Sequence, residues 1–163
     1  MKKLIMSIVL LATTICANAQ KISGSLDGLS TQKFLNVAVD FSEASIHGMC
    51  EEDFAELETD WEKDKPSIIA KIISNMSEKL EGRFVFGLKK PESYTLKIHV
   101  NTISIKGNFN FDVIVLKADG QEEAKIENLN AKGGTFGSAL NLIGDGAEQS
   151  GKVIAKILKN KVK

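Results

Sequence analysis

The sequence has few of the residues that define several specialised classes of protein. Its 163 residues include two cysteines, two prolines, one tryptophan and one tyrosine. Two cysteines are too few for a disulfide-based scaffold, and two prolines exclude a collagen-like or proline-rich chain. Lysine plus arginine number 21, as do aspartate plus glutamate, so no positive excess is present for binding nucleic acid through bulk charge. The 43% of hydrophobic residues is typical of a folded globular protein.

The first nineteen residues have the pattern of a secretory signal peptide. Lysines at positions 2 and 3 precede an apolar stretch, residues 4–15, and residues 17–19 (Ala-Asn-Ala) supply the small side chains of a cleavage site. The apolar stretch is shorter than the roughly 20 residues that a membrane-spanning helix needs, and no later stretch is apolar enough to be one. We therefore predict cleavage after Ala19 and a periplasmic or secreted protein.

Cleavage would leave Cys50 as the single cysteine, which excludes an internal disulfide but permits an intermolecular one. A lipoprotein signal with its lipid on Cys16 is the alternative, although isoleucine precedes this cysteine where such signals have a small residue. Residues 20–33, rich in glutamine, serine, glycine and threonine, are expected to form a flexible leader. Residues 34–163 are then long enough for a single domain with its own core.

Hydrophobic periodicity predicts both strands and helices in this domain. Residues 94–100 alternate apolar and polar side chains, as a strand with one buried face does. Residues 66–81 carry apolar side chains at helical spacing, with Pro66 near the start and Gly82 after the end. The expected strands are residues 34–41, 84–86, 94–100, 109–115 and 124–129. The expected helices are residues 51–64, 66–81 and 147–160.

The order of these segments indicates the fold class. A bulge is expected near residues 101–102, a turn at 107–108, and a hairpin at Asp119-Gly120. Strands joined as hairpins, with helices grouped before and after them, predict an α+β fold rather than a parallel α/β sheet. We expect a mostly antiparallel sheet of about four or five strands with two or three helices packed on one face.

Phe54 and Trp61 are the candidate partner-binding residues. They lie at helical spacing in residues 51–64, a segment with eight acidic side chains and one lysine. Two interpretations stay open: both belong to the core, or both form an exposed aromatic patch, since aromatic side chains often anchor protein interfaces. The acidic side chains could also hold calcium, but the segment lacks the spacing and the central glycine of a calcium loop.

Cys50 and His47 are the candidate residues for chemistry. A thiol and an imidazole three positions apart could serve a small hydrolase, although acidic neighbours raise the pKa of a thiol. The same pair could bind zinc, but no second pair follows at zinc spacing. Residues 146–152 resemble a phosphate-binding loop, yet Val153 replaces the serine or threonine that would hold magnesium. We predict no catalytic residue, no metal and no cofactor.

The whole layout resembles small envelope domains of unknown function from Gram-negative bacteria. The resemblance rests on structural features spread over the chain. They are an export signal, the strand end at residues 37–41, the helix leading to Phe84, the strand at 94–100, the hairpin at 119–120, the glycines at 133–137 and the lysine-rich helix at 147–159. Because such domains have no catalytic residues to carry over, the resemblance implies no site.

These observations predict a non-enzymatic envelope protein that binds or scaffolds another envelope component. Two alternatives stay open: a small hydrolase that uses Cys50, and a carrier with a ligand pocket under the glycine-rich connection at residues 133–146. The lysines of the last helix form either a solvated face or a contact with anionic lipid. Neither the oligomeric state nor the identity of a partner follows from the sequence.

Overall fold

The computed structural model describes residues 20–87, 90–91 and 93–162. Residues 1–19, which contain the predicted signal peptide, lie outside the described residues. In chain order the elements are β1 (Lys21–Gly24), a 3-10 helix (Asp27–Thr31), β2 (Phe34–Asp40), β3 (Ser45–Ile46), α1 (Glu51–Leu57), α2 (Trp61–Lys79), β4 (Val85–Gly87), β5 (Thr95–Ile103), β6 (Phe109–Leu116), β7 (Glu122–Ala131) and α3 (Ala139–Lys161).

The strands form one seven-stranded mixed sheet in the order β1-β7-β6-β5-β2-β4, with β3 also paired to β5. Strands β5, β6, β7 and β1 pair antiparallel, whereas β2 pairs parallel with both β5 and β4. The prediction of four or five mostly antiparallel strands is therefore corrected. Helices α1 and α2 connect β2 to its parallel neighbours, and a crossover of this kind is what parallel pairing requires.

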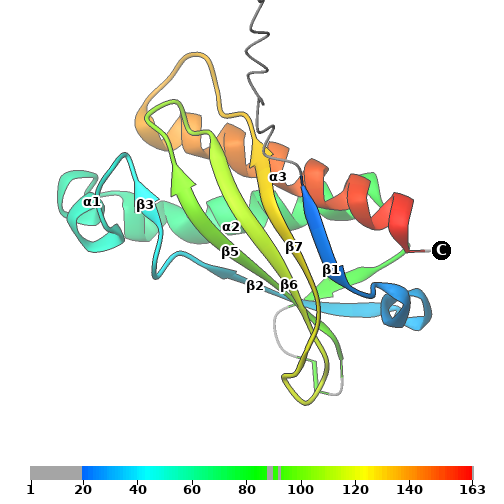
Figure 1. The fold of residues 1–163 in the computed structure, drawn as a ribbon. Helices are drawn as coiled ribbons and strands as arrows, with labels where there is room; N and C mark the ends of the chain where they lie inside the picture. Colours follow the sequence, from blue (N-terminus) through cyan, green and yellow to red (C-terminus); the bar gives the residue numbers. More distant parts are fainter. Residues whose placement is uncertain (1–19, 88–89, 92, 163) are drawn as a thin grey trace, which may run out of the picture.

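Helices α2 and α3 cover one face of the sheet and run side by side in the same direction (Figure 1). Residues of the two helices lie next to each other at both ends. Near their beginnings Ser67 and Lys71 of α2 line a hollow with Asn141 of α3, and farther along Lys79 shares another hollow with Lys159. The coarser prediction of an α+β fold with helices on one face is confirmed.

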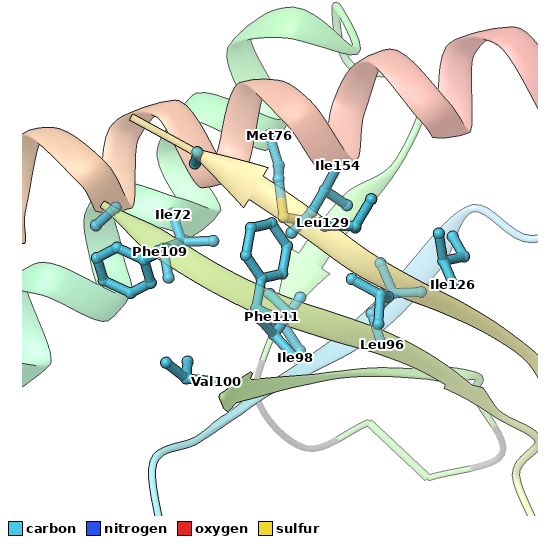
Figure 2. Packing of buried hydrophobic residues seen from close by; sticks show 14 of the residues in the cluster. Ile72, Met76, Leu96, Ile98, Val100, Phe109, Phe111, Ile126, Leu129 and Ile154 are labelled. Atoms are coloured by element: carbon cyan, nitrogen blue, oxygen red, sulfur yellow. The ribbon is translucent and has the colours of Figure 1, made fainter. Parts of the chain in front are cut away.

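The core lies between the helices and the inner face of the sheet (Figure 2). Strands β5 and β6 each present every second side chain to this core, which confirms the alternation read from the sequence. Met76 of α2 and Ile154 of α3 point toward Phe111 of β6 (Figure 2), and all three side chains are fully buried. The register shift between Val100 and Thr102 is the predicted bulge.

The two expected helices, 51–64 and 66–81, are divided at another point in the structure. Helix α1 ends at Leu57 and α2 begins at Trp61, so Pro66 lies inside α2 rather than near its start.

Two further segments differ from their predictions. Residues 20–33 are not a flexible leader: they supply edge strand β1 and a 3-10 helix, and Leu26 and Leu29 are buried in the core. The last helix begins at Ala139 rather than near residue 147. The first half of α3 was not predicted as helix because it contains glycines, and each glycine disfavours an isolated helix by about 1 kcal/mol relative to alanine.

Candidate functional site

Two turns pack against each other at one end of the sheet and form what we call the loop-end surface, residues 104–108 between β5 and β6 and residues 132–138 between β7 and α3. The backbone N–H of Gly133 donates to Oδ1 of Asn108 over 2.8 Å. The backbones approach so closely that a Cβ on Gly133 would lie 2.0 Å from the carbonyl oxygen of Lys106. Glycine is therefore required there, and the two turns are held as one unit.

The loop-end surface exposes two large apolar side chains. Phe136 is 89% exposed and Ile105 is 72% exposed, and each belongs to one of the two packed turns. Lys106 and Lys132 lie in the same turns and are also exposed. An aromatic side chain almost fully in water costs free energy that contact with a partner would recover.

Two hollows flank the β5–β6 turn. One, of about 490 Å³, lies between this turn and His47 with Gly48. The other, of about 340 Å³, lies between this turn and the glycine-rich connection, where Gly134 and Leu142 line it. A hollow is thus present beside residues 133–146, where the carrier hypothesis places one, and it is open to solvent rather than enclosed.

The structure does not bring Cys50 and His47 together as a catalytic pair. Cys50 is exposed, and its sulfur accepts a hydrogen bond from the backbone N–H of Asp53 as the cap of α1. His47 has a positive φ of 54° and packs edge-on against Phe54, with its Nε2 atom buried and without a hydrogen-bond partner among the described residues. The two side chains therefore have separate structural roles.

The ionisation of both groups also disfavours thiol chemistry. The backbone N–H of Asp53 lowers the pKa of Cys50, but the Asp53 and Glu52 side chains, with a slight loss of hydration, outweigh it, so the pKa of the thiol is raised. Burial lowers the pKa of His47, and the charge of Glu58 offsets this only in part. A reactive cysteine needs the opposite change, a depressed pKa beside a base.

Phe54 and Trp61, the residues predicted to contact a partner, lie in the core. Phe54 is 1% exposed and Trp61 is fully buried. The two rings meet edge to face, with centroids 5.3 Å apart, and Trp61 also meets Phe41 at 5.6 Å. The indole Nε1 donates to Glu51 over 2.9 Å. Of the two open interpretations, the structure therefore shows burial in the core, and the expectation that these two residues contact a partner is corrected. A tryptophan whose N–H has a partner can be buried whole.

The outer face of the sheet carries polar groups that pair with one another. Asp40 accepts from the Ser42 hydroxyl over 2.7 Å and lies 2.9 Å from the Lys97 ammonium group. These contacts, that of Ser42 first, hold the pKa of Asp40 well below its usual range. His99 lies on this polar face, as its place in the alternation predicts, with Nδ1 3.5 Å from Asp40 and Nε2 3.7 Å from Glu43.

The remaining sequence candidates find structural explanations. Residues 146–152, which resemble a phosphate-binding loop, lie within helix α3, and Gly146 and Gly151 are buried there against the β5–β6 turn and α2. Over residues 20–87, 90–91 and 93–162, no three histidine, cysteine, aspartate or glutamate side chains gather where they could hold a metal ion. No helix in that part of the chain has the length and hydropathy to cross a membrane.

Comparison with known proteins gives distant likenesses in backbone arrangement. No family model matches the chain, and no curated protein matches it. Among solved structures, a PelC dodecamer from Paraburkholderia phytofirmans aligns over 89% of this chain and 98% of its own, with 8% identity and a TM-score of 0.49. A single-residue variant of that PelC covers 89% and 99%, with 10% identity and a TM-score of 0.47.

A third solved structure, titled as an uncharacterized protein, covers 78% of this chain and 93% of its own, with 14% identity and a TM-score of 0.42. At these identities the likeness concerns backbone arrangement, and it assigns no ligand, partner or activity to this chain.

Proposed function

We propose that the chain is an exported, non-enzymatic domain that binds another component of the cell envelope through the loop-end surface. The observation that carries the proposal is the exposure of Phe136, at 89%, beside a second turn that exposes Ile105. Export is supported by the pattern of residues 1–19. A binding role is supported by the absence of a paired nucleophile and base at Cys50, the one candidate nucleophile that the sequence offered.

The surface has the features of a docking site for a protein partner. Full burial of a phenylalanine side chain is worth about 2–3 kcal/mol, and that of an isoleucine nearly as much. Interfaces concentrate their free energy in a few such anchors with a polar rim around them, and Lys106, Lys132 and Asn108 supply that rim. The interlocked glycine backbones reduce the entropy lost on binding, because the two turns are already ordered.

The test is capture of partners from envelope extracts with the tagged protein and with a Phe136→Ser, Ile105→Ser double variant. We expect the variant to lose the specifically captured protein, with a weakening of at least about a hundredfold, because about 3 kcal/mol or more of apolar burial is removed. Both side chains are exposed, so the variant should unfold at the same urea concentration as the wild type.

A matched control is Val85→Ser, which removes another exposed apolar side chain, 59% exposed, from edge strand β4. We expect this variant to retain the captured protein. Equal capture by the wild type and the double variant would refute the loop-end surface as the binding site. Loss of capture in both variants would show that the effect is one of general surface hydrophobicity.

A carrier of a small ligand is the second candidate, favoured by the hollow of about 340 Å³ beside residues 133–135. Native mass spectrometry of the protein purified after export tests it. A retained molecule whose mass disappears when Gly134 is replaced by valine would support the carrier. A spectrum with the bare protein mass alone would leave the binding domain as the function.

A further inference from the structure

The C-terminal halves of α2 and α3 form a second distinctive surface, which we call the basic face: Lys79 from α2 and Lys152, Lys156, Lys159 and Lys161 from α3. A hollow of about 200 Å³ lies among Lys79, Lys152, Lys156 and Lys159. A second hollow, of about 280 Å³, lies beside Lys156 and Lys161. The parallel course of the two helices places their lysine-bearing ends together (Figure 1).

Acidic side chains compensate only part of this charge. Lys159 pairs with Glu81 at 3.1 Å, and Lys79 with Glu78 at 3.6 Å. For Lys152, Lys156 and Lys161, no carboxylate of the described residues lies within ion-pair distance. Among the described residues, the basic face therefore has a net positive charge that its two carboxylate partners do not neutralise.

The helix dipole explains some of these lysines but not all of them. Cations stabilise a helix near its C-terminus, and the effect is confined to the last turn, where Lys159 and Lys161 lie. Lys152 lies more than two turns before the end of α3. It is also four residues from Lys156, a spacing at which like charges destabilise a helix. An external anion would remove this cost.

The place where the chain enters the domain points to the same surface. Gln20, the first described residue, lines the second hollow together with Lys156, Asn160 and Lys161. If cleavage follows Ala19, the new amino terminus adds a further positive charge at this face.

We propose that the basic face docks the domain on a bilayer surface with anionic lipid headgroups. The lysines contact the lipid phosphates, and the hollows beside Lys156 admit headgroup atoms. This proposal does not depend on the loop-end surface. The acidic residues 51–64 lie around the start of α2. At 1.5 Å per residue, the first residue of this helix, Trp61, lies about 27 Å along the axis from Lys79. Repulsion of that acidic end orients the domain with the basic face toward the bilayer.

Co-sedimentation with lipid vesicles tests the proposal. The protein, purified after export, is mixed with vesicles of phosphatidylglycerol and phosphatidylcholine or of phosphatidylcholine alone. We expect sedimentation with the anionic vesicles only, and its loss at about 1 M salt, where the screening length falls to about 3 Å. A Lys152→Gln, Lys156→Gln, Lys161→Gln variant should bind about a hundredfold more weakly, because each lysine near an anionic surface contributes about fivefold.

The matched control is Lys63→Gln, Lys97→Gln, Lys117→Gln, which removes the same charge from positions outside both the basic face and the loop-end surface. We expect it to bind like the wild type. Equal loss in both triple variants would overturn the proposal, and so would the absence of sedimentation with anionic vesicles. Sedimentation velocity without lipid adds one more outcome: salt-sensitive self-association abolished by the first triple variant would assign the basic face to the acidic end of a second copy instead.

Discussion

Three glycines inside α3 offer a sharp test of how the two helices pack, because their replacement by alanine should have opposite effects. Alanine in a helix interior is favoured over glycine by about 1 kcal/mol, so each substitution would stabilise an isolated helix. A Cβ on Gly146 would lie 2.0 Å from the carbonyl oxygen of Gly107, and one on Gly151 would lie 2.3 Å from that of Ile72. Both neighbours are backbone atoms that cannot move alone.

Gly144 provides the internal control. The nearest atom to a Cβ there would be Nζ of Lys71, at 2.8 Å, and the next two belong to the same side chain. This is the flexible end of a half-exposed side chain that pairs with Glu148. Lys71 can move aside at little cost. We therefore expect Gly144→Ala to raise the free energy of unfolding by up to about 1 kcal/mol, through helix propensity alone.

For Gly146→Ala and Gly151→Ala we expect a net loss of about 2 kcal/mol each. Forced overlap in a packed core costs about 1–3 kcal/mol, and contact with backbone lies at or beyond the upper end of that range. The propensity gain of about 1 kcal/mol offsets part of the cost. The melting temperature should fall by about 4–8 °C for a protein of this size.

Urea unfolding followed by tryptophan fluorescence measures the three variants. Trp61 is the single tryptophan and is fully buried, so its emission reports exposure of the core without a label. The order of stability should be Gly144→Ala, wild type, and then the other two variants. If Gly146→Ala or Gly151→Ala were as stable as Gly144→Ala, the close approach of α3 to the β5–β6 turn and to α2 would be wrong.

Three side chains, Cys50, Asp40 and Trp61, support the remaining predictions. Iodoacetamide should modify Cys50 slowly at neutral pH because its thiol pKa is raised, and fast labelling would instead support the hydrolase hypothesis. Cys50→Ser should keep or improve the stability of the fold, since serine is a better helix cap. The lowered pKa of Asp40 stabilises the fold above the unfolded-state pKa of about 3.9, and this stabilisation is lost as pH falls through the folded-state pKa. The difference in urea midpoint between wild type and Asp40→Asn should therefore narrow from neutral pH to about pH 2, and a constant difference would contradict this. Trp61→Phe should cost about 1–3 kcal/mol, because it removes the Nε1–Glu51 hydrogen bond and leaves a small cavity. Urea unfolding followed by circular dichroism measures this variant, which has no tryptophan, and an unchanged midpoint would show that the site repacks.

Elements with strong hydrophobic alternation were predictable. Strands β5 and β6, the bulge near Thr102 and most of α2 follow the sequence pattern. Strands β1 and β3 were missed, because four and two residues are too few for a period to show. Parallel pairing of β2 with β5 was also missed, since pairing partners distant in the chain leave no local trace.

The candidate site also combines features that the sequence could predict with features that it could not. Exposure of Phe136 was not predicted, because a lone phenylalanine in a glycine-rich segment has no periodic neighbours that assign it to a face. Burial of Phe54 and Trp61 was one of two open interpretations. It was decided by Phe41 and Glu51, whose ring and carboxylate meet the indole only in the folded chain.

The order of residues alone determined the export pattern of residues 1–19, the α+β class and the apolar stripes of the helices, because each depends on side chains that are near neighbours in the chain. The tertiary structure alone decided that Gly107, Gly133 and Gly146 meet, that Gln20 lies beside Lys156, and that the ends of α2 and α3 combine their lysines. These features join segments far apart in sequence, and only packing around a common core sets the distances between them.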